Sequence, residues 1–225
     1  GFEELLWIYG LAAALAAFVF LWIAREHPPV PPEPGAPEER ILVFDGLKAM
    51  IRRRDVLFLM AIFFIGLGLF NAVSTWIEDI VRPRGFSISQ AGWLGGLMLL
   101  GGIIGAIVMP VLSDKIARRK PFILIALAGL IPGLVGMTFT TSLPVLLAAG
   151  FVFGFFLLSA GPIGFQYAAE ITRPIPEGAS NTVLLLMGQV SGVLFILAMD
   201  AFKSKATGSM TGSLVILTAM IIGSF

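Results

Sequence analysis

Long apolar runs alternate with short polar breaks along this chain. The runs cover residues 5–24, 56–78, 90–112, 121–139, 144–168 and 179–200 approximately, and a seventh begins near Thr211. Each complete run is about 20 residues long, which is the length that a helix needs to cross the hydrocarbon core of a membrane. The pattern therefore predicts an all-α transmembrane protein. Because the sequence starts at Gly1 and stops within the span at 211–225, we expect it to be part of a longer protein.

The longest polar break, residues 25–54, separates the first span (1–24) from a bundle over 55–225. The break opens with REHPPVPPEPGAPEER, whose prolines and charges favour an extended linker. In the part that follows, several apolar residues share one helical face, and two interpretations stay open: an amphipathic helix on the inner membrane surface, or an extension of the next span. The residues of that apolar face are Val43, Phe44, Leu47, Met50 and Ile51.

The placement of the cations orients the spans. Eleven of the 15 lysines and arginines lie in the breaks 25–54, 113–120 and 169–178, and four lie in the intervening breaks. Cytoplasmic loops of membrane proteins carry an excess of Lys and Arg. We therefore expect these three loops to be cytoplasmic and Gly1 to start outside, in a plasma membrane or a bacterial inner membrane.

Composition narrows the range of chemistry. The chain is 57% hydrophobic and 13% charged, which is far from the balance of a water-soluble domain. It has no cysteine, and its one histidine, His27, lies in the proline-rich linker. No cluster of His, Cys or paired carboxylates exists at one depth, so we expect no enzyme, no metal site and no cofactor. Nucleic acid is not an expected partner.

Glycines recur at four-residue spacing inside the spans, and such spacing predicts close approach of helix backbones. The pairs are Gly92 and Gly96, Gly101 and Gly105, Gly129 and Gly133, Gly150 and Gly154, and Gly188 and Gly192.

One polar break carries a motif. In PVLSDKIARRKPF, residues 110–122, an Asp-Lys pair is followed by Ala117 and three cations. This spacing resembles the signature between the second and third helices of each six-helix half of major facilitator transporters. Both glycine positions of that signature differ here, as Pro110 and Ala117, which is typical of the second copy. The resemblance implies the major facilitator fold, with helix six, the central loop and the C-terminal six-helix bundle, and it implies a missing N-terminal half as a partner.

The same loop suggests a cytoplasmic gate. An aspartate at a helix end beside arginines can hold a gate closed through charge-assisted hydrogen bonds. The alternative is that the cations only fix topology. Glu170 lies at the cytoplasmic end of its span and is expected to pair either with Arg173 or with the cluster 118–120. The gate candidates are Asp114, Lys115, Arg118, Arg119, Glu170 and Arg173.

A narrower resemblance covers residues 150–198, which are similar to helices ten and eleven of the feline leukaemia virus subgroup C receptor-related transporters. The positions that carry it include Gly154, Phe155, Phe156, Pro162, Gly164, Phe165, Glu170, Pro174, Gln189 and Gly192. This family implies choline, ethanolamine or haem as cargo, and it implies substrate contact by Gln189. It also places an aromatic residue where this chain has Asn71. That departure argues against a choline-like cargo, because the aromatic ring stacks on a quaternary ammonium.

Polar residues within the spans are candidates for the substrate pathway, because such residues avoid lipid. Gln189 lies near the bilayer centre, where it either contacts substrate or bonds to a neighbouring helix. Asn71, Ser74, Thr75 and Glu78 form one helical stripe. The pathway candidates are Asn71, Ser74, Thr75, Ser159, Gln166 and Gln189, whereas we expect Glu78, Asp79 and Asp200 to be solvated at the opposite surface.

Together these features predict a secondary active or facilitative transporter of a small organic solute, working by alternating access in a lipid bilayer. No acid or histidine lies at mid-depth, so a proton relay is not expected here. One alternative is a general major facilitator exporter or importer of organic anions or drugs. Another is a membrane receptor or scaffold that does not transport.

Overall fold

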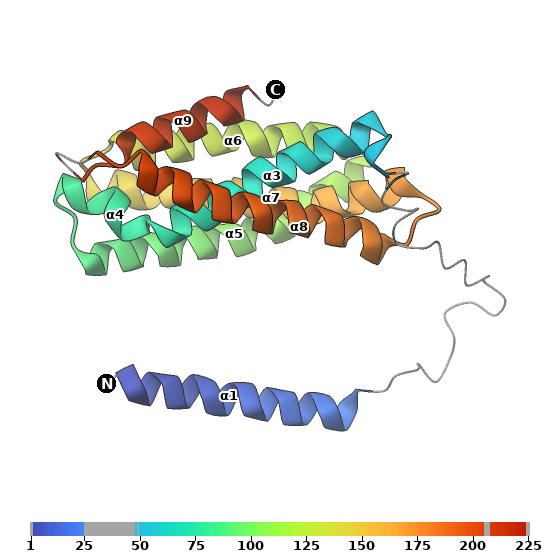
Figure 1. Ribbon diagram of the computed structural model, residues 1–225, viewed down its shortest axis with the longest axis horizontal. Coiled ribbons are helices and arrows are strands. Elements are labelled where there is room, and N and C mark those ends of the chain that lie inside the picture. The colour runs from blue at the N-terminus through green and yellow to red at the C-terminus, as the bar shows by residue number, and fades with distance from the viewer. Residues whose placement is uncertain (1, 25–47, 49, 205–207, 224–225) are drawn as a thin grey trace. The chain divides into compact units, whose positions relative to one another are not determined.

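The computed structural model describes residues 2–24, 48, 50–204 and 208–223, and its regular elements there are helices (Figure 1). The chain divides into two compact units, Gly1–Arg40 and Ile41–Phe225. The first contains α1, Phe2–Ile23, whose apolar side chains are exposed from Leu5 to Ile23. The expected linker and most of the amphipathic segment before residue 48 lie outside the described residues.

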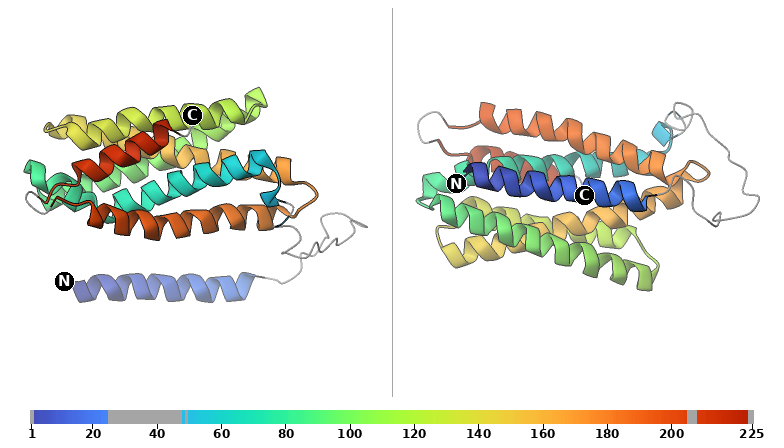
Figure 2. Two further views of the ribbon diagram at one scale, coloured as in Figure 1. Left: turned by 45° about the horizontal axis from the view of Figure 1, so that its top comes forward. Right: turned by 90° about the horizontal axis from the view of Figure 1, so that it is seen from below.

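The second unit is an antiparallel helical bundle (Figure 2). Five of its helices, and α1 besides, are long and apolar enough to cross a membrane, whereas the last helix has 12 residues. This finding confirms the all-α transmembrane prediction. The elements are α3 (Arg54–Thr75), α4 (Ile77–Val81), a short 3-10 turn (Arg82–Arg84), α5 (Ile88–Ile116), α6 (Lys120–Phe139), α7 (Leu143–Thr172), α8 (Glu177–Ala201) and α9 (Thr211–Ile222).

Two helices extend beyond their apolar runs into the expected loops. α5 continues through Ser113 to Ile116 and ends where Ala117 adopts a left-handed conformation, with φ of 54°. α7 likewise continues to Thr172, past the predicted end at residue 168. Hydropathy marks only the part of a helix that lies in hydrocarbon, and a helix can continue into the headgroup region with charged side chains. The break between α5 and α6 is therefore shorter than residues 113–120.

The span expected over 56–78 is interrupted near its C-terminal end. α3 ends at Thr75, Trp76 departs from helical geometry with φ of −99° and ψ of 16°, and α4 begins at Ile77. The Trp76 indole Nε1 donates to the Ile196 carbonyl at 3.1 Å, which ties the break to α8. No proline or glycine stands at the break, so its position is set by this tertiary contact rather than by a helix-breaking residue.

Residues just before α3 pack onto the end of the bundle where α7 meets α8. Met50, from the predicted apolar face, is 1% exposed and packs with Val56 and Ile175, while Ile51 is exposed. The Arg53 guanidinium donates to the carbonyls of Ile171 and Arg173, at the end of α7. The entry to α3 is thus fastened to the turn between α7 and α8.

Glycine allows α7 to lie backbone-to-backbone against its neighbours. A Cβ atom built on Gly105 of α5 would lie 2.0 Å from the Phe155 carbonyl oxygen, and one on Gly154 of α7 would lie 1.8 Å from the Met98 carbonyl oxygen. These distances are far below van der Waals contact. Gly92 and Gly96 have nothing within 4 Å, so the packing prediction for that pair is wrong. The two glycines do lie on one face of α5, but that face contacts no described helix.

We predict that Gly105→Ala destabilises the bundle by about 1–3 kcal/mol, the usual range for overpacking. The matched control is Gly96→Ala in the same helix, where the added methyl group meets open space. Both changes favour the helical backbone equally. Thermal unfolding of the two variants in detergent or nanodiscs measures the difference, and equal unfolding temperatures would contradict the close contact between α5 and α7.

Candidate functional site

Arg119 gathers polar groups from two helices at the cytoplasmic end expected from the sequence. Its guanidinium pairs with Asp114 at the end of α5 and lies 3.1 Å from the Glu170 carboxylate on α7. It also donates to the Ser113 hydroxyl at 3.3 Å. Because Ala117 turns the chain back, Arg119 returns over the last turn of α5. We call Ser113, Asp114, Arg119, Gln166 and Glu170 the Arg119 cluster.

The cluster is held by a network of charge-assisted bonds. The Gln166 amide donates to Glu170 at 3.4 Å, one turn away on α7, and the Ser113 hydroxyl donates to the Arg118 carbonyl at 3.1 Å. Hydrogen bonding to Asp114 and then to Glu170 raises the pKa of Arg119, although partial burial opposes the effect. The Arg119 side chain is 15% exposed, so its bonds are less screened by water than those of a free surface pair.

The gate candidates separate into two groups. Asp114, Arg119 and Glu170 come together, and Gln166, expected in the pathway, joins them. The side chains of Lys115, Arg118 and Arg173 are exposed and form no ion pair with any described residue. Of the two partners expected for Glu170, the structure therefore selects the cluster rather than Arg173.

Two further contacts at the same end of the bundle were not predicted from the sequence. Lys120 pairs with Asp55 of α3 at 3.3 Å and lies over the Tyr167 ring at 5.8 Å. Arg53 caps the end of α7, as described above. Both partners of the Lys120 contact lie far away in the sequence, so no local spacing signals it.

The pathway candidates of α3 lie in its last five residues, 71–75, where α3 packs against α8. The Asn71 amide donates to the Gly188 carbonyl at 3.4 Å, and a Cβ atom on Gly192 would lie 2.5 Å from that amide nitrogen. Ser74 keeps a buried hydroxyl oxygen with no partner among the described residues, whereas Thr75 is exposed. Asn71 is thus packed against α8 at its amide nitrogen.

Gln189 differs from the other candidates because its side chain is exposed. It is the central residue of the 25-residue helix α8, and its amide makes no hydrogen bond with any described residue. Ser159, by contrast, is buried and donates to the Phe156 carbonyl of its own helix at 2.7 Å. Gln189 therefore presents free donors and an acceptor at mid-depth, and Ser159 does not.

The opposite end of the bundle carries a contact that we did not expect. Asp79 pairs with Lys203 at 2.7 Å, and both side chains are about one-third exposed. Lys203 also lies over the Trp76 ring at 5.4 Å. The expectation that Asp79 is merely solvated is wrong, because the break at Trp76 turns α4 toward the end of α8.

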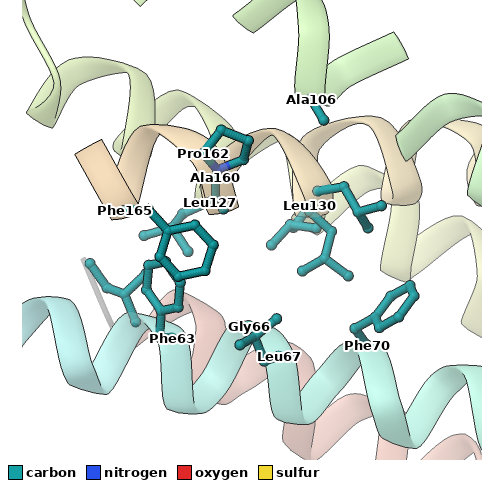
Figure 3. A pocket seen from close by; sticks show the side chains of 14 residues that line it. Phe63, Gly66, Leu67, Phe70, Ala106, Leu127, Leu130, Ala160, Pro162 and Phe165 are labelled. Atoms are coloured by element: carbon teal, nitrogen blue, oxygen red, sulfur yellow. The ribbon is translucent and has the colours of Figure 1, made fainter. Parts of the chain in front are cut away.

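An apolar pocket of about 280 Å³ is lined chiefly by α3 and α7, with Leu127 and Leu130 of α6 and Ala106 of α5 completing its wall (Figure 3). The rings of Phe63 and Phe165 meet at one end, Phe70 lies at the other, and Gly66 and Leu67 lie between them. None of the lining side chains carries a charge or a hydrogen-bonding group. The lining residues are Ile62, Phe63, Gly66, Leu67, Phe70, Ala106, Leu127, Leu130, Leu157, Leu158, Ala160, Gly161, Pro162 and Phe165.

The family model described as Major Facilitator Superfamily matches residues 1–195 and again 77–225. The chain belongs to this superfamily. It is therefore an integral, multi-pass membrane protein of a transporter family, and its six apolar helices agree with that membership.

Relatives of this facilitator chain include both archaeal and animal proteins. It is 31% identical over 202 residues to an uncharacterised protein of Archaeoglobus fulgidus, covering 89% of each chain. It is 27% identical over 228 residues to the choline/ethanolamine transporter FLVCR1 of Mus musculus, covering 96% of this chain and 40% of the relative. It is 29% identical over 201 residues to solute carrier family 49 member A3 of Xenopus tropicalis, covering 86% and 42% respectively.

These matches confirm the resemblance to the feline leukaemia virus subgroup C receptor-related transporters that residues 150–198 indicated. The chain spans less than half the length of the animal relatives that it matches. Membership supports transport of a small solute rather than enzymatic chemistry, while the cargo and the route belong to the proposal below.

We predict that Arg119→Gln lowers the stability of this facilitator bundle by about 1–2 kcal/mol, between the values for exposed and buried ion pairs. The loss arises because Asp114 and Glu170 are left close together without their shared cation. Arg118→Gln is the matched control, since that side chain has no ion pair with a described residue. Unfolding temperatures compared at low and high salt test this, and a loss of equal size in the control would exclude the cluster as its cause.

Proposed function

We propose that this chain forms one half of a secondary transporter that moves a small organic solute by alternating access. The observation that carries the proposal is the exposed, unpaired amide of Gln189 at the centre of a membrane-spanning helix. A polar side chain at that depth avoids lipid, and it gains a partner when it faces a cavity shared with a second half. Asn71, Ser74 and Thr75 lie on the neighbouring helix and extend this polar region.

The Arg119 cluster serves as the cytoplasmic gate in this proposal. It joins the end of α5 to the end of α7 through side chains alone, so the two helix ends can separate without breaking backbone bonds. Asp114 is 63% exposed, which leaves its carboxylate accessible to groups of the opposite half. Charge-assisted bonds near water break at modest net cost, because water replaces the lost partners. Such bonds suit a contact that forms and opens in each cycle.

Lys115, Arg118 and Arg173 complete the proposed gate surface. Since their side chains lack ion-pair partners among the described residues, they are available to meet acidic groups of the other half or anionic lipid headgroups. The proposed topology follows the cation count, with loops 25–54, 113–120 and 169–178 in the cytoplasm. Residues 1–24 then correspond to the sixth helix and 55–225 to the second bundle of a two-half transporter.

The cargo is proposed from both relatives and residues. Relatives are named as choline/ethanolamine transporters, so an organic cation is one candidate, and haem remains another from the family resemblance. Organic anions or drugs are the alternative cargo within the superfamily, and a receptor or scaffold is the alternative without transport. The acids of the described spans lie near helix ends, which favours facilitated diffusion or coupling through the opposite half.

We predict that Gln189→Ala lowers solute uptake by the intact protein by about five- to 150-fold, because losing one hydrogen bond in a dry site costs about 1–3 kcal/mol. Val190→Ala is the matched control, since Val190 is the next residue and is 45% exposed. Uptake into proteoliposomes, normalised to reconstituted protein, measures the effect. Unchanged uptake with Gln189→Ala would remove Gln189 from the pathway.

A second prediction concerns the gate and needs no known cargo. Asp114→Asn weakens the Arg119 cluster, and we expect the population open to the cytoplasm to rise by about fivefold for each 1 kcal/mol lost. A Thr75→Cys variant supplies a thiol in a chain that has none, at an exposed position. The rate of labelling by a membrane-impermeant thiol reagent should rise from the cytoplasmic side and fall from the outside.

Asp200→Asn is the control for this experiment, because Asp200 is exposed at the other end of the bundle and has no ion pair with a described residue. Labelling that stays equal on both sides in Asp114→Asn would argue against a gate and against alternating access.

A further inference from the structure

The pocket between α3 and α7 has walls made only of hydrocarbon. Its lining includes three phenylalanines and several leucines, and no lining side chain bears a charge or a hydrogen-bond donor (Figure 3). Gly66 lies halfway along α3, so the pocket sits near mid-depth rather than at a membrane surface. A pocket of this kind binds the apolar part of a ligand, at about 25 cal/mol for each Å² of apolar surface removed from water.

The pocket lacks the groups that hold a permanent cation. A quaternary ammonium has no hydrogen-bond donor, so proteins hold it with aromatic faces or carboxylates. The rings of Phe63 and Phe165 pack on each other at 5.0 Å, and Phe63 is 4% exposed, so these rings are already engaged. Phe70 is the one phenylalanine of the lining that stands apart from this pair (Figure 3).

No carboxylate lines this pocket either. The described acids of the bundle lie at helix ends, and several are already paired: Asp55 with Lys120, Asp79 with Lys203, and Asp114 and Glu170 with Arg119. Burying an ion without such a partner costs several kcal/mol. The walls of the pocket therefore favour an uncharged group over a cationic one.

Neutral polar groups adjoin the pocket at one side. Leu67 lines the pocket and also packs against Gly188, because a Cβ atom on Gly188 would lie 2.3 Å from Leu67 Cδ1. The Gly188 carbonyl accepts from Asn71, and Gln189 is the next residue. Carboxamides both donate and accept, which suits a hydroxyl or amide group of a ligand. Asn71 lies one helical turn beyond Leu67 on α3, so its neutral amide lies next to the apolar pocket.

We infer that this half of the transporter holds an uncharged amphiphile, with its apolar part between Phe63, Phe70 and Phe165 and its polar end toward the Asn71 amide. The inference rests on the proposed transport function and specifies its substrate class. It sets this chain apart from relatives named for choline and ethanolamine.

A pair of probes that differ only in charge tests the inference. Choline and its neutral carbon isostere, 3,3-dimethylbutan-1-ol, have the same shape and the same hydroxyl group. Binding of each radiolabelled probe to the intact protein in nanodiscs is measured by equilibrium dialysis, with empty nanodiscs correcting for partition into lipid. We expect the neutral isostere to bind at least tenfold more tightly than choline.

Variants that fill the pocket test whether the probes bind at this site. A Cβ atom on Gly66 has its nearest neighbour at 3.9 Å, and one on Gly161 has none within 4 Å, so Gly66→Leu and Gly161→Leu extend into the pocket without a backbone clash. Each should weaken binding of the isostere at least tenfold. Gly96→Leu, on an open face of α5 outside the pocket, is the matched control. Unfolding temperatures identify any variant that fails to fold.

Tighter binding of choline, no binding of either probe, or unchanged isostere binding in both folded pocket variants would overturn the inference. The labelling experiment with Thr75→Cys measures alternating access and needs no ligand. If labelling responds to Asp114→Asn while choline is preferred, the substrate class is wrong and the transport proposal stands. If labelling does not respond, the transport proposal itself fails.

Discussion

The rest of the bundle depends on the close contact of α7 with α5 and α6, which glycine makes possible. In a membrane, lipid is as apolar as leucine, so helices associate through close packing rather than through the hydrophobic effect. Gly105 and Gly154 remove the side chains that would hold α5 and α7 apart, and Gly133 does the same for α6. This contact fixes α7, which carries one wall of the pocket and also Glu170.

Several charged side chains at the two ends of the bundle are paired, whereas some polar groups within its helices are not. At the ends, charged side chains from separate helices are paired, as Arg119 with Glu170 and Lys203 with Asp79. At the centre of α8 Gln189 is unpaired, and near the end of α3 the Ser74 hydroxyl is unsatisfied among the described residues. Paired ends hold helices in position near water, where breaking a pair costs little. Unpaired amides at mid-depth are costly in lipid, so they are retained where a ligand or a second half completes them.

Local patterns predicted the parts of the structure that depend on local physics. The apolar runs predicted the spans because the bilayer sets their length, and the Asp-x4-Arg spacing brought Asp114 and Arg119 together because a helix end and one tight turn separate them. The break at Trp76, the Arg53 cap on α7 and the pair Asp79–Lys203 were missed, because each joins residues more than 100 positions apart. The spacing of Gly92 and Gly96 misled us, because spacing describes a helix face and does not say whether a partner lies there.

The residue at position 71 links the packing of α3 on α8 to the class of solute that the site can bind. An asparagine there lets α3 approach α8, because its short amide fits against Gly192 and donates to Gly188. A larger aromatic ring at the same place needs space that this contact does not leave. The close packing of Asn71 on Gly188 and Gly192 is therefore also what removes an aromatic face from the site. What remains for a ligand is the hydrocarbon pocket with a neutral amide beside it, and this combination favours a solute without charge.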